Sequence, residues 1–313
     1  MTRLSLETPP AGVSPDRWKP HLENEQVITG DLWLLSWDNL ARGLGLVTAH
    51  FDEYTLVWPI SLPSDPVAPP AIEIRQTPLG IPLYAWPSRE TGISTALFDR
   101  PLGPLLNKSL VDATATAFDD GTPPPIPFTP EPTAEGRPAA KEYSRLLVDI
   151  WATLGDIQWP TFGTEARLNP DTLRAAGIKP STLAHVLGMQ TAAAVQAFRG
   201  ESPVTSDQAE SLAQVTGLDT RQLITTDSFE VSLRLLKPQY KNQLRQVSLQ
   251  LRVDESRARD IVASEFELAA RSNGTIDSRL NGVFARLIAG GTNHWLTTNH
   301  YSRPVPTKPS PDS

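Results

Sequence analysis

The sequence predicts an α+β multidomain protein in which a small N-terminal β barrel is joined by a proline-rich linker to an all-α C-terminal region. Three observations lead to this prediction. The chain has 313 residues, whereas one compact domain usually takes about 100–200. Short runs rich in β-branched and aromatic residues fill its first third, and such runs are typical of strands. After a segment with seven prolines, apolar residues recur with the period of about 3.6 that indicates helices.

The composition excludes several classes of site. The chain contains no cysteine, so disulfides, thiolate zinc sites, iron–sulfur clusters and a cysteine nucleophile are excluded, and a cytoplasmic location is favoured. The first residues are acidic and proline-rich, whereas a signal peptide would be basic and then apolar. No stretch of the sequence approaches the ~20 apolar residues of a membrane helix. We therefore expect a soluble protein that does not enter a membrane.

The β barrel is expected over residues 28–118, after a flexible N-terminal segment at 1–27. Glycine, proline and aspartate separate its strands, which is the pattern of a small, partly open barrel. The five candidate strands cover residues 31–37, 44–49, 54–61, 71–74 and 81–86. Residues 119–138 follow as the linker, because their prolines and few large apolar side chains cannot form a core.

The rest of the chain is expected to be helical up to a disordered tail at 291–313. It divides into a helical domain at 139–227 and further C-terminal helices at 228–290. Glycine and proline mark the ends of the helices, and Asp254 is a candidate N-cap. The candidate helices cover approximately residues 139–156, 170–176, 181–187, 190–199, 206–216, 220–225, 238–251, 255–272 and 276–289.

Residues 181–200 contain the strongest functional signal in the sequence. Two short helices pack at a steep angle when the first has a small residue at the crossing and the turn tolerates positive φ, and Ala184 and Gly188 fill these positions. Met189 follows as an apolar plug, and Gly200 ends the second helix. This segment resembles the XRE, or lambda-repressor-like, helix-turn-helix family, whose pattern is L-A-x-x-L-G-(V/M) before a recognition helix that ends in glycine.

The resemblance extends over residues 166–226 and implies a five-helix DNA-binding domain whose recognition helix is 190–199. The long or polar side chains of that helix are then the candidate DNA contacts, namely Gln190, Thr191, Gln196 and Arg199. Glutamine can pair bidentately with adenine, and arginine can pair with guanine or phosphate. The resemblance also implies a transcription regulator that binds duplex DNA as a homodimer, in a toxin–antitoxin or defence context.

The distribution of charge leaves an alternative open for this domain. The whole chain carries a net charge of −7, of which −9 falls on residues 1–136 and +2 on residues 137–313. Residues 166–226 are neutral, although neutralisation of phosphates supplies much of the affinity for DNA. A five-helix module used for packing or dimerisation is therefore the alternative interpretation.

A basic stretch follows at residues 234–259, where the net charge is +5. Lys237, Lys241 and Arg245 recur there at i, i+4 and i+8, a spacing that places them on one face of a helix. We expect these three side chains to lie along a phosphate backbone. A solvated helix face without a ligand is the alternative.

Three successive segments of the expected barrel carry a second resemblance. Gly30-Asp-Leu-Trp-Leu-Leu, Arg42-Gly-Leu-Gly-Leu-Val-Thr and Val57-Trp-Pro-Ile-Ser61 resemble, in this order, the SH3-like barrel of MazF/PemK-type endoribonucleases. The resemblance implies that Arg42 stabilises a phosphorane anion on RNA and that Ser61 donates a hydrogen bond to it. Residues 1–118 hold 8 basic and 13 acidic residues, a balance that opposes RNA entry. A barrel used as a sensor or protein-binding module is the alternative.

No cofactor or metal site is expected. The five histidines form no H-E-x-x-H or comparable pair, and no phosphate-binding glycine loop is present. The sequence therefore predicts a sequence-specific DNA-binding transcriptional regulator, not an enzyme, whose barrel receives a protein partner or ligand. The alternatives are an RNA endonuclease toxin restrained in cis by its helical half, and a non-catalytic protein-interaction scaffold.

Overall fold

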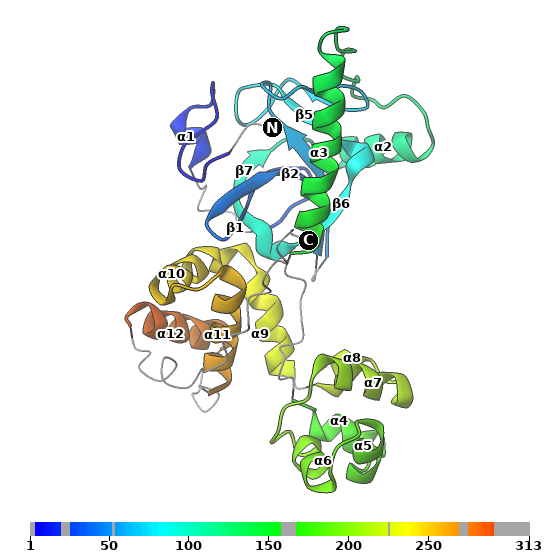
Figure 1. Cartoon of the computed structure of the whole chain (residues 1–313), viewed down its shortest axis with the longest axis vertical. Coiled ribbons are helices and arrows are strands. Elements are labelled where there is room, and N and C mark those ends of the chain that lie inside the picture. The colour runs from blue at the N-terminus through cyan, green and yellow to red at the C-terminus, as the bar shows by residue number, and fades with distance from the viewer. Residues whose placement is uncertain are drawn as a thin grey trace, which may run out of the picture.

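The computed structural model describes residues 4–19, 26–51, 54–157, 167–224, 226–268 and 275–290. A curled antiparallel sheet forms the N-terminal part and helices dominate the C-terminal part, which confirms the α+β arrangement (Figure 1). The strands are β1 (Asp31–Trp37), β2 (Leu40–His50), β3 (Tyr54–Ser61), β4 (Ile72–Ile74), β5 (Leu83–Ala85), β6 (Thr91–Ser94) and β7 (Phe98–Pro104). The α-helices are α1 (Pro15–Trp18), α2 (Lys108–Asp119), α3 (Arg137–Gly155), α4 (Pro170–Ala175), α5 (Pro180–Val186), α6 (Thr191–Phe198), α7 (Ser206–Thr216), α8 (Thr220–Leu223), α9 (Thr226–Leu236), α10 (Lys241–Leu251), α11 (Glu255–Leu268) and α12 (Ile276–Ile288), and the 3-10 helices are η1 (Pro87–Arg89), η2 (Thr95–Leu97) and η3 (Pro238–Tyr240).

The sheet is a curled, open ribbon of antiparallel strands in the order β4-β5-β3-β2-β1-β7, with β6 also paired to β3. The register shifts between Leu35 and Ser36 on β1 and between Val47 and Ala49 on β2, and such bulges increase the local twist and bend of a strand. Asp38 and Asn39 join β1 to β2 with φ values of 52° and 59°, which is the geometry of a two-residue type I′ hairpin. The described strands therefore form a half-barrel rather than a closed one.

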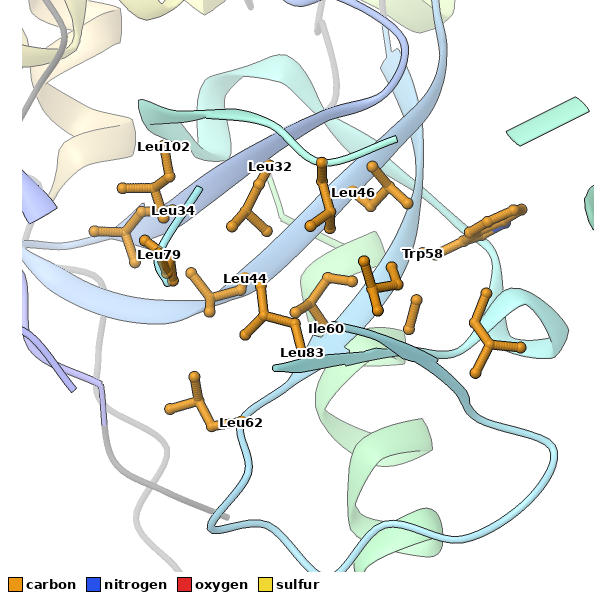
Figure 2. Close-up of a cluster of buried hydrophobic side chains, with 14 of the residues drawn as sticks. Leu32, Leu34, Leu44, Leu46, Trp58, Ile60, Leu62, Leu79, Leu83 and Leu102 are labelled. Carbon is orange, nitrogen blue, oxygen red and sulfur yellow. The ribbon is translucent and has the colours of Figure 1, made fainter. Parts of the chain in front are cut away.

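Both faces of this sheet are buried. Side chains alternate along β1, so Leu32 and Leu34 enter one apolar cluster and Trp33 and Leu35 enter another. Figure 2 shows the first cluster, where side chains of β1, β2 and β3 meet those of the shorter strands. Trp18 of α1 is 2% exposed and belongs to this cluster. The N-terminal segment expected to be flexible is thus anchored on the sheet in its described part.

Helix α3 covers the second face of the sheet. Its buried side chains recur at the spacing of one helical face and pack against β1, β2 and β3; they are Tyr143, Leu147, Trp151 and Leu154. The indole of Trp151 lies over Gly43 and Gly45 of β2, where a β-carbon would meet it at 3.6 Å and 3.5 Å. This differs from the expected grouping of α3 with the helices that follow, because the apolar face of α3 is matched by the sheet.

The proline-rich segment before α3 is also attached to the sheet. Phe128 forms a β-bridge with Ile72 of β4, and the amide of Thr129 donates to the carbonyl of Ala71 at 2.8 Å. A short edge strand leaves unpaired backbone groups. The backbone of residues 127–129 pairs with some of these groups on and beside β4. The segment at 119–138 therefore continues the N-terminal fold and does not separate two domains.

The remaining helices form two further cores. Helices α4 to α8 surround one apolar cluster, and α9 to α12 surround another. Figure 1 shows α4–α8 set apart from the sheet, at the far end of α9, whereas α10 and α11 lie against the sheet. Leu236 at the end of α9 enters the cluster on the second face of the sheet. In the described part of the chain, α9 thus contacts both α8 and the sheet side.

Replacing Trp151 by alanine should release α3 from the sheet. The side chain is 3% exposed, and Trp→Ala substitutions in a core cost about 3–5 kcal/mol of the free energy of unfolding. Leu146→Ala is the matched control on the same helix, since Leu146 is 37% exposed and the loss should stay below about 1 kcal/mol. Urea denaturation measures both variants. Equal losses would contradict the packing described for this face.

Candidate nucleic-acid interface

Helices α5 and α6 form a tight pair joined by residues 187–190. Gly188 in the turn has a φ of 60°, which glycine adopts without steric cost. The amide of Met189 donates to the carbonyl of Ala184 at 3.1 Å, and both side chains pack against the core of α4–α8. Gly188 therefore has the positive φ expected from the sequence, and Ala184 and Met189 are partly buried against this core.

Hydrogen bonds at the helix ends hold α6 in place. Arg167 donates through its guanidinium to the carbonyls of Gly200 and Glu201, at 3.1 Å and 2.9 Å. These acceptors follow the C-terminal end of α6, where a positive charge is favourable. Thr205 and Gln208 form a reciprocal capping box that starts α7. A β-bridge between Leu168 and Ile224 closes the domain.

The outward face of α6 carries the side chains that the sequence singled out. Gln190, Thr191, Gln196 and Arg199 are all exposed, and none of these four side chains has a hydrogen bond or ion pair within the described part of the chain. Ala192 is exposed beside them, while Ala194 and Ala197 are buried in the core. The helix therefore presents two amides, one hydroxyl, one guanidinium and one methyl group, all free to contact a ligand.

The N-terminal end of α6 adds backbone donors to this face. Gln190 is the N-cap residue, and no side chain accepts a hydrogen bond from the first amides of the helix. Unsatisfied amides at a helix N-terminus attract anions such as phosphate. The face thus combines groups that can read bases with groups that can hold a DNA backbone.

The electrostatic balance around α6 is nearly even. Lys179 and His185 on α5 and Arg199 after α6 are exposed, and so are Glu201 and Asp207 beyond it. Outside this face, Arg174 is paired with Asp171 at 2.8 Å. Among the described residues, the surface around α6 therefore has no general positive field of the kind that attracts a polyanion.

The basic stretch expected to lie along phosphate has a different role in the structure. Lys241 is 3% exposed and donates to the carbonyls of Ser36 and Ala96, at 3.0 Å and 2.8 Å, and to Glu255 at 2.6 Å. Its ammonium group therefore cannot reach DNA, contrary to the prediction from its spacing. Arg245 forms an ion pair with the buried carboxylate of Asp99.

Lys237 remains exposed but precedes the 3-10 helix η3, so it does not continue a face of α10. Other basic residues of this stretch are also paired: Arg234 contacts Glu230 and Asp277, and Arg259 contacts Glu255. The stretch is thus largely an internal network of ion pairs, which joins the C-terminal helices to the sheet.

Burial shifts the pKa values in this network. Desolvation lowers the pKa of Lys241 to about 8, against the opposing influence of Glu255. Burial alone would raise the pKa of Glu255, but the positive charges of Lys241 and Arg259 outweigh it and hold that pKa below its usual value. For Asp99, Arg245 and Arg100 likewise outweigh burial and lower the pKa.

The residues expected to act on RNA are not assembled into an open site. Ser61 is 1% exposed; it accepts a hydrogen bond from the indole of Trp86 at 2.8 Å and shares one with the hydroxyl of Tyr143 at 2.6 Å. Arg42 donates through Nε to the carbonyl of Trp37 at 3.2 Å. Helix α3 therefore covers the Ser61 hydroxyl, and burial raises the pKa of the Tyr143 hydroxyl that bonds to it.

The described residues hold no group of three or more histidine, aspartate or glutamate side chains arranged for a metal ion. His21, His294 and His300 lie outside the described residues. Among the helices that the structure describes, none has the length and apolar content needed to span a membrane. Comparison with protein-family models, with curated proteins and with solved structures finds no match for this chain.

Titration of Lys241 should make stability depend on pH in a defined direction. Its pKa is about 8 in the folded protein and 10.5 when unperturbed, so between these values the unfolded state binds more protons and folding gains stability as pH rises. From pH 7 to pH 10, the free energy of unfolding should rise more for the wild type than for Lys241→Met. The difference between the two increases should be roughly 2 kcal/mol.

Chemical denaturation of the wild type and Lys241→Met at a series of pH values measures this gain. Lys237→Met is the control, because Lys237 is exposed and its removal should leave the slope unchanged. Parallel curves for the wild type and Lys241→Met would contradict a lowered pKa for Lys241.

Proposed function

We propose that this protein is a sequence-specific DNA-binding regulator that places α6 in the major groove of duplex DNA. The exposed face of α6 carries the proposal, since its four polar side chains lack partners among the described residues. Gln190 and Thr191 lie at the N-terminal end of the helix, and Gln196 and Arg199 lie at its C-terminal end. An α-helix with its side chains is about 10–12 Å in diameter, which fits a major groove about 12 Å wide. The packed, capped α4–α8 module supplies the rigid support that base reading requires.

The chemistry of the face sets what kind of sequence it reads. Gln190 and Gln196 offer the amides that pair with adenine, and Arg199 offers the fork that pairs with guanine. The methyl group of Ala192 can contact the methyl group of thymine. The proposed site therefore mixes A·T and G·C pairs within one half-site.

A homodimer is part of this proposal. One α6 helix covers few base pairs, and two copies related by a two-fold axis would read a palindrome with half-sites about one helical turn apart. The sheet and α3 form the part of the regulator that receives a partner or ligand. An antitoxin-like or defence-associated role is the context we propose for it, by the resemblance of residues 181–200 to the XRE family.

Selection of bound sequences from a random duplex pool tests the proposal. The wild type should enrich a roughly palindromic motif, and Gln196→Ala/Arg199→Ala should lower specific affinity by about a hundredfold or more, because each bidentate base contact contributes about 1–3 kcal/mol. The matched control is Gln222→Ala/Arg174→Ala, which removes the same side-chain types from α8 and α4. Absence of any enriched motif, or equal binding by both double variants, would exclude α6 as the reading helix.

The salt dependence of binding distinguishes the two roles open to Arg199. If its guanidinium contacts phosphate, Arg199→Ala should reduce the slope of log K against log salt concentration by about 1 and weaken all sequences alike. If it reads guanine, the slope should change little and preference should relax at one position of each half-site. Fluorescence anisotropy with the selected duplex and single-base variants measures both quantities. An unchanged slope and an unchanged preference would show that Arg199 does not contact DNA.

A further inference from the structure

A groove lies between the N-terminal half of α3 and the sheet-side residues that precede β4 and β6. Its volume is about 750 Å³, within the roughly 300–1,000 Å³ that small-molecule sites occupy. The sheet side contributes Pro69, Trp86 and Arg89, and α3 contributes residues from Arg137 to Asp149. The size of the groove therefore suits an organic ligand rather than a single ion.

Three free cations line this groove. Arg89, Arg137 and Lys141 are exposed, and their charged groups have no hydrogen bond or ion pair among the described residues. Arg137 and Lys141 are four positions apart on α3, so they occupy the same helical face, and Arg89 lies at the end of η1 on the sheet side. Positive charge thus approaches the groove from both of its walls.

The two acidic residues of the groove share one partner, so its four cations and two carboxylates leave a net charge of +2. Arg145 contacts Glu142 at 2.7 Å and Asp149 at 4.0 Å, and the pKa of Glu142 is lowered by its hydrogen bond to Arg145. The three free cations therefore give the groove a positive charge, although residues 1–136 as a whole carry −9. An anion is the ligand that this local field selects.

The rest of the lining is partly apolar. Pro69, Pro138 and Val148 present flat or compact apolar surfaces, and Trp86 lies behind them. The hydroxyl of Ser144 also lines the groove, without a hydrogen bond within the described part of the chain. Arginine guanidinium groups bind phosphate oxygens in a bidentate manner and stack on planar rings.

We propose that this groove binds a phosphorylated small molecule of nucleotide size. The phosphate contacts Arg137, Lys141 and Arg89, and the planar body lies against the prolines and Val148. The site is separate from α6, since it is built from α3 and the sheet. Ligand binding and DNA binding can therefore succeed or fail independently of each other.

Isothermal titration calorimetry of the full chain with ATP as the probe tests this proposal. The wild type should bind ATP, and Arg137→Ala/Lys141→Ala should weaken binding by about tenfold for each cation removed, because hydrogen bonds to charged groups are the stronger class. The control is Arg75→Ala/Lys108→Ala, which removes the same two residue types from exposed positions outside the groove and should bind like the wild type. Inorganic phosphate and adenosine, titrated separately, should each bind more weakly than ATP.

Several outcomes would overturn the assignment. They are no binding of ATP by the wild type at millimolar concentration, equal weakening in the two double variants, and affinity for phosphate or for adenosine equal to that for ATP. Circular dichroism of each variant verifies that the helices are intact. Arg137→Ala/Lys141→Ala should still enrich the DNA motif of the wild type, so loss of the ligand site is distinguishable from loss of DNA binding.

Discussion

A buried cluster of charges fixes how the C-terminal helices meet the sheet. Lys241 and Arg259 both bind the carboxylate of Glu255, and both cations lie near the ring of Trp37, at 5.2 Å and 5.6 Å from its centroid. Buried ions are costly unless their geometry and hydrogen bonding are good, and here Lys241 also uses backbone carbonyls on the sheet side. In this docked position the ammonium group of Lys241 has three acceptors and Glu255 is shared by Lys241 and Arg259, whereas Nε of Arg259 has no hydrogen-bond partner among the described residues. The position of α9, and of the α4–α8 module that precedes it, depends on that docking.

Coverage of the sheet on both faces determines where function can lie. α3 and the end of α9 cover one face, while α1, α2 and the short strands surround the other cluster. The hydroxyl of Ser61 is consequently occupied by Tyr143 and Trp86, and the middle of the sheet offers no surface to a polynucleotide. The face of α6 and the groove along α3 are two exposed surfaces at the periphery of the described fold. Both surfaces present polar side chains that lack partners among the described residues. They differ in this from the charged side chains elsewhere that form ion pairs.

Local signals in the sequence predicted those parts of the fold that local physics determines. The bounds of β1 and β3 coincide with the expected strands, and the turn at Gly188 follows from its position between two apolar helices. Lys241 could not be placed in this way, because its partner Ser36 is 205 residues away and its i, i+4 spacing is the same as that of a solvated face. The attachment of the proline-rich segment to the sheet is not predictable from its composition, because the edge strand β4 that pairs with Phe128 is remote in sequence. Helices α2 and α9 were not predicted, although Asn107 caps the start of α2 and Pro238 follows the end of α9.

The four apolar clusters divide the protein into parts that can be perturbed separately. Residues of the α4–α8 cluster are not shared with the other three clusters in the described part of the chain, so the stability of that module rests on its own packing and caps. By contrast, α3 and α9 share one cluster, through Trp151 and Leu236, so a movement of α3 on the sheet would disturb the end of α9. A ligand bound against α3 therefore contacts the helix that packs with the C-terminal end of α9. The N-terminal end of α9 follows α8. Among the described residues, α9 contacts both α8 and the sheet side, so it offers a packed route from the groove toward α6.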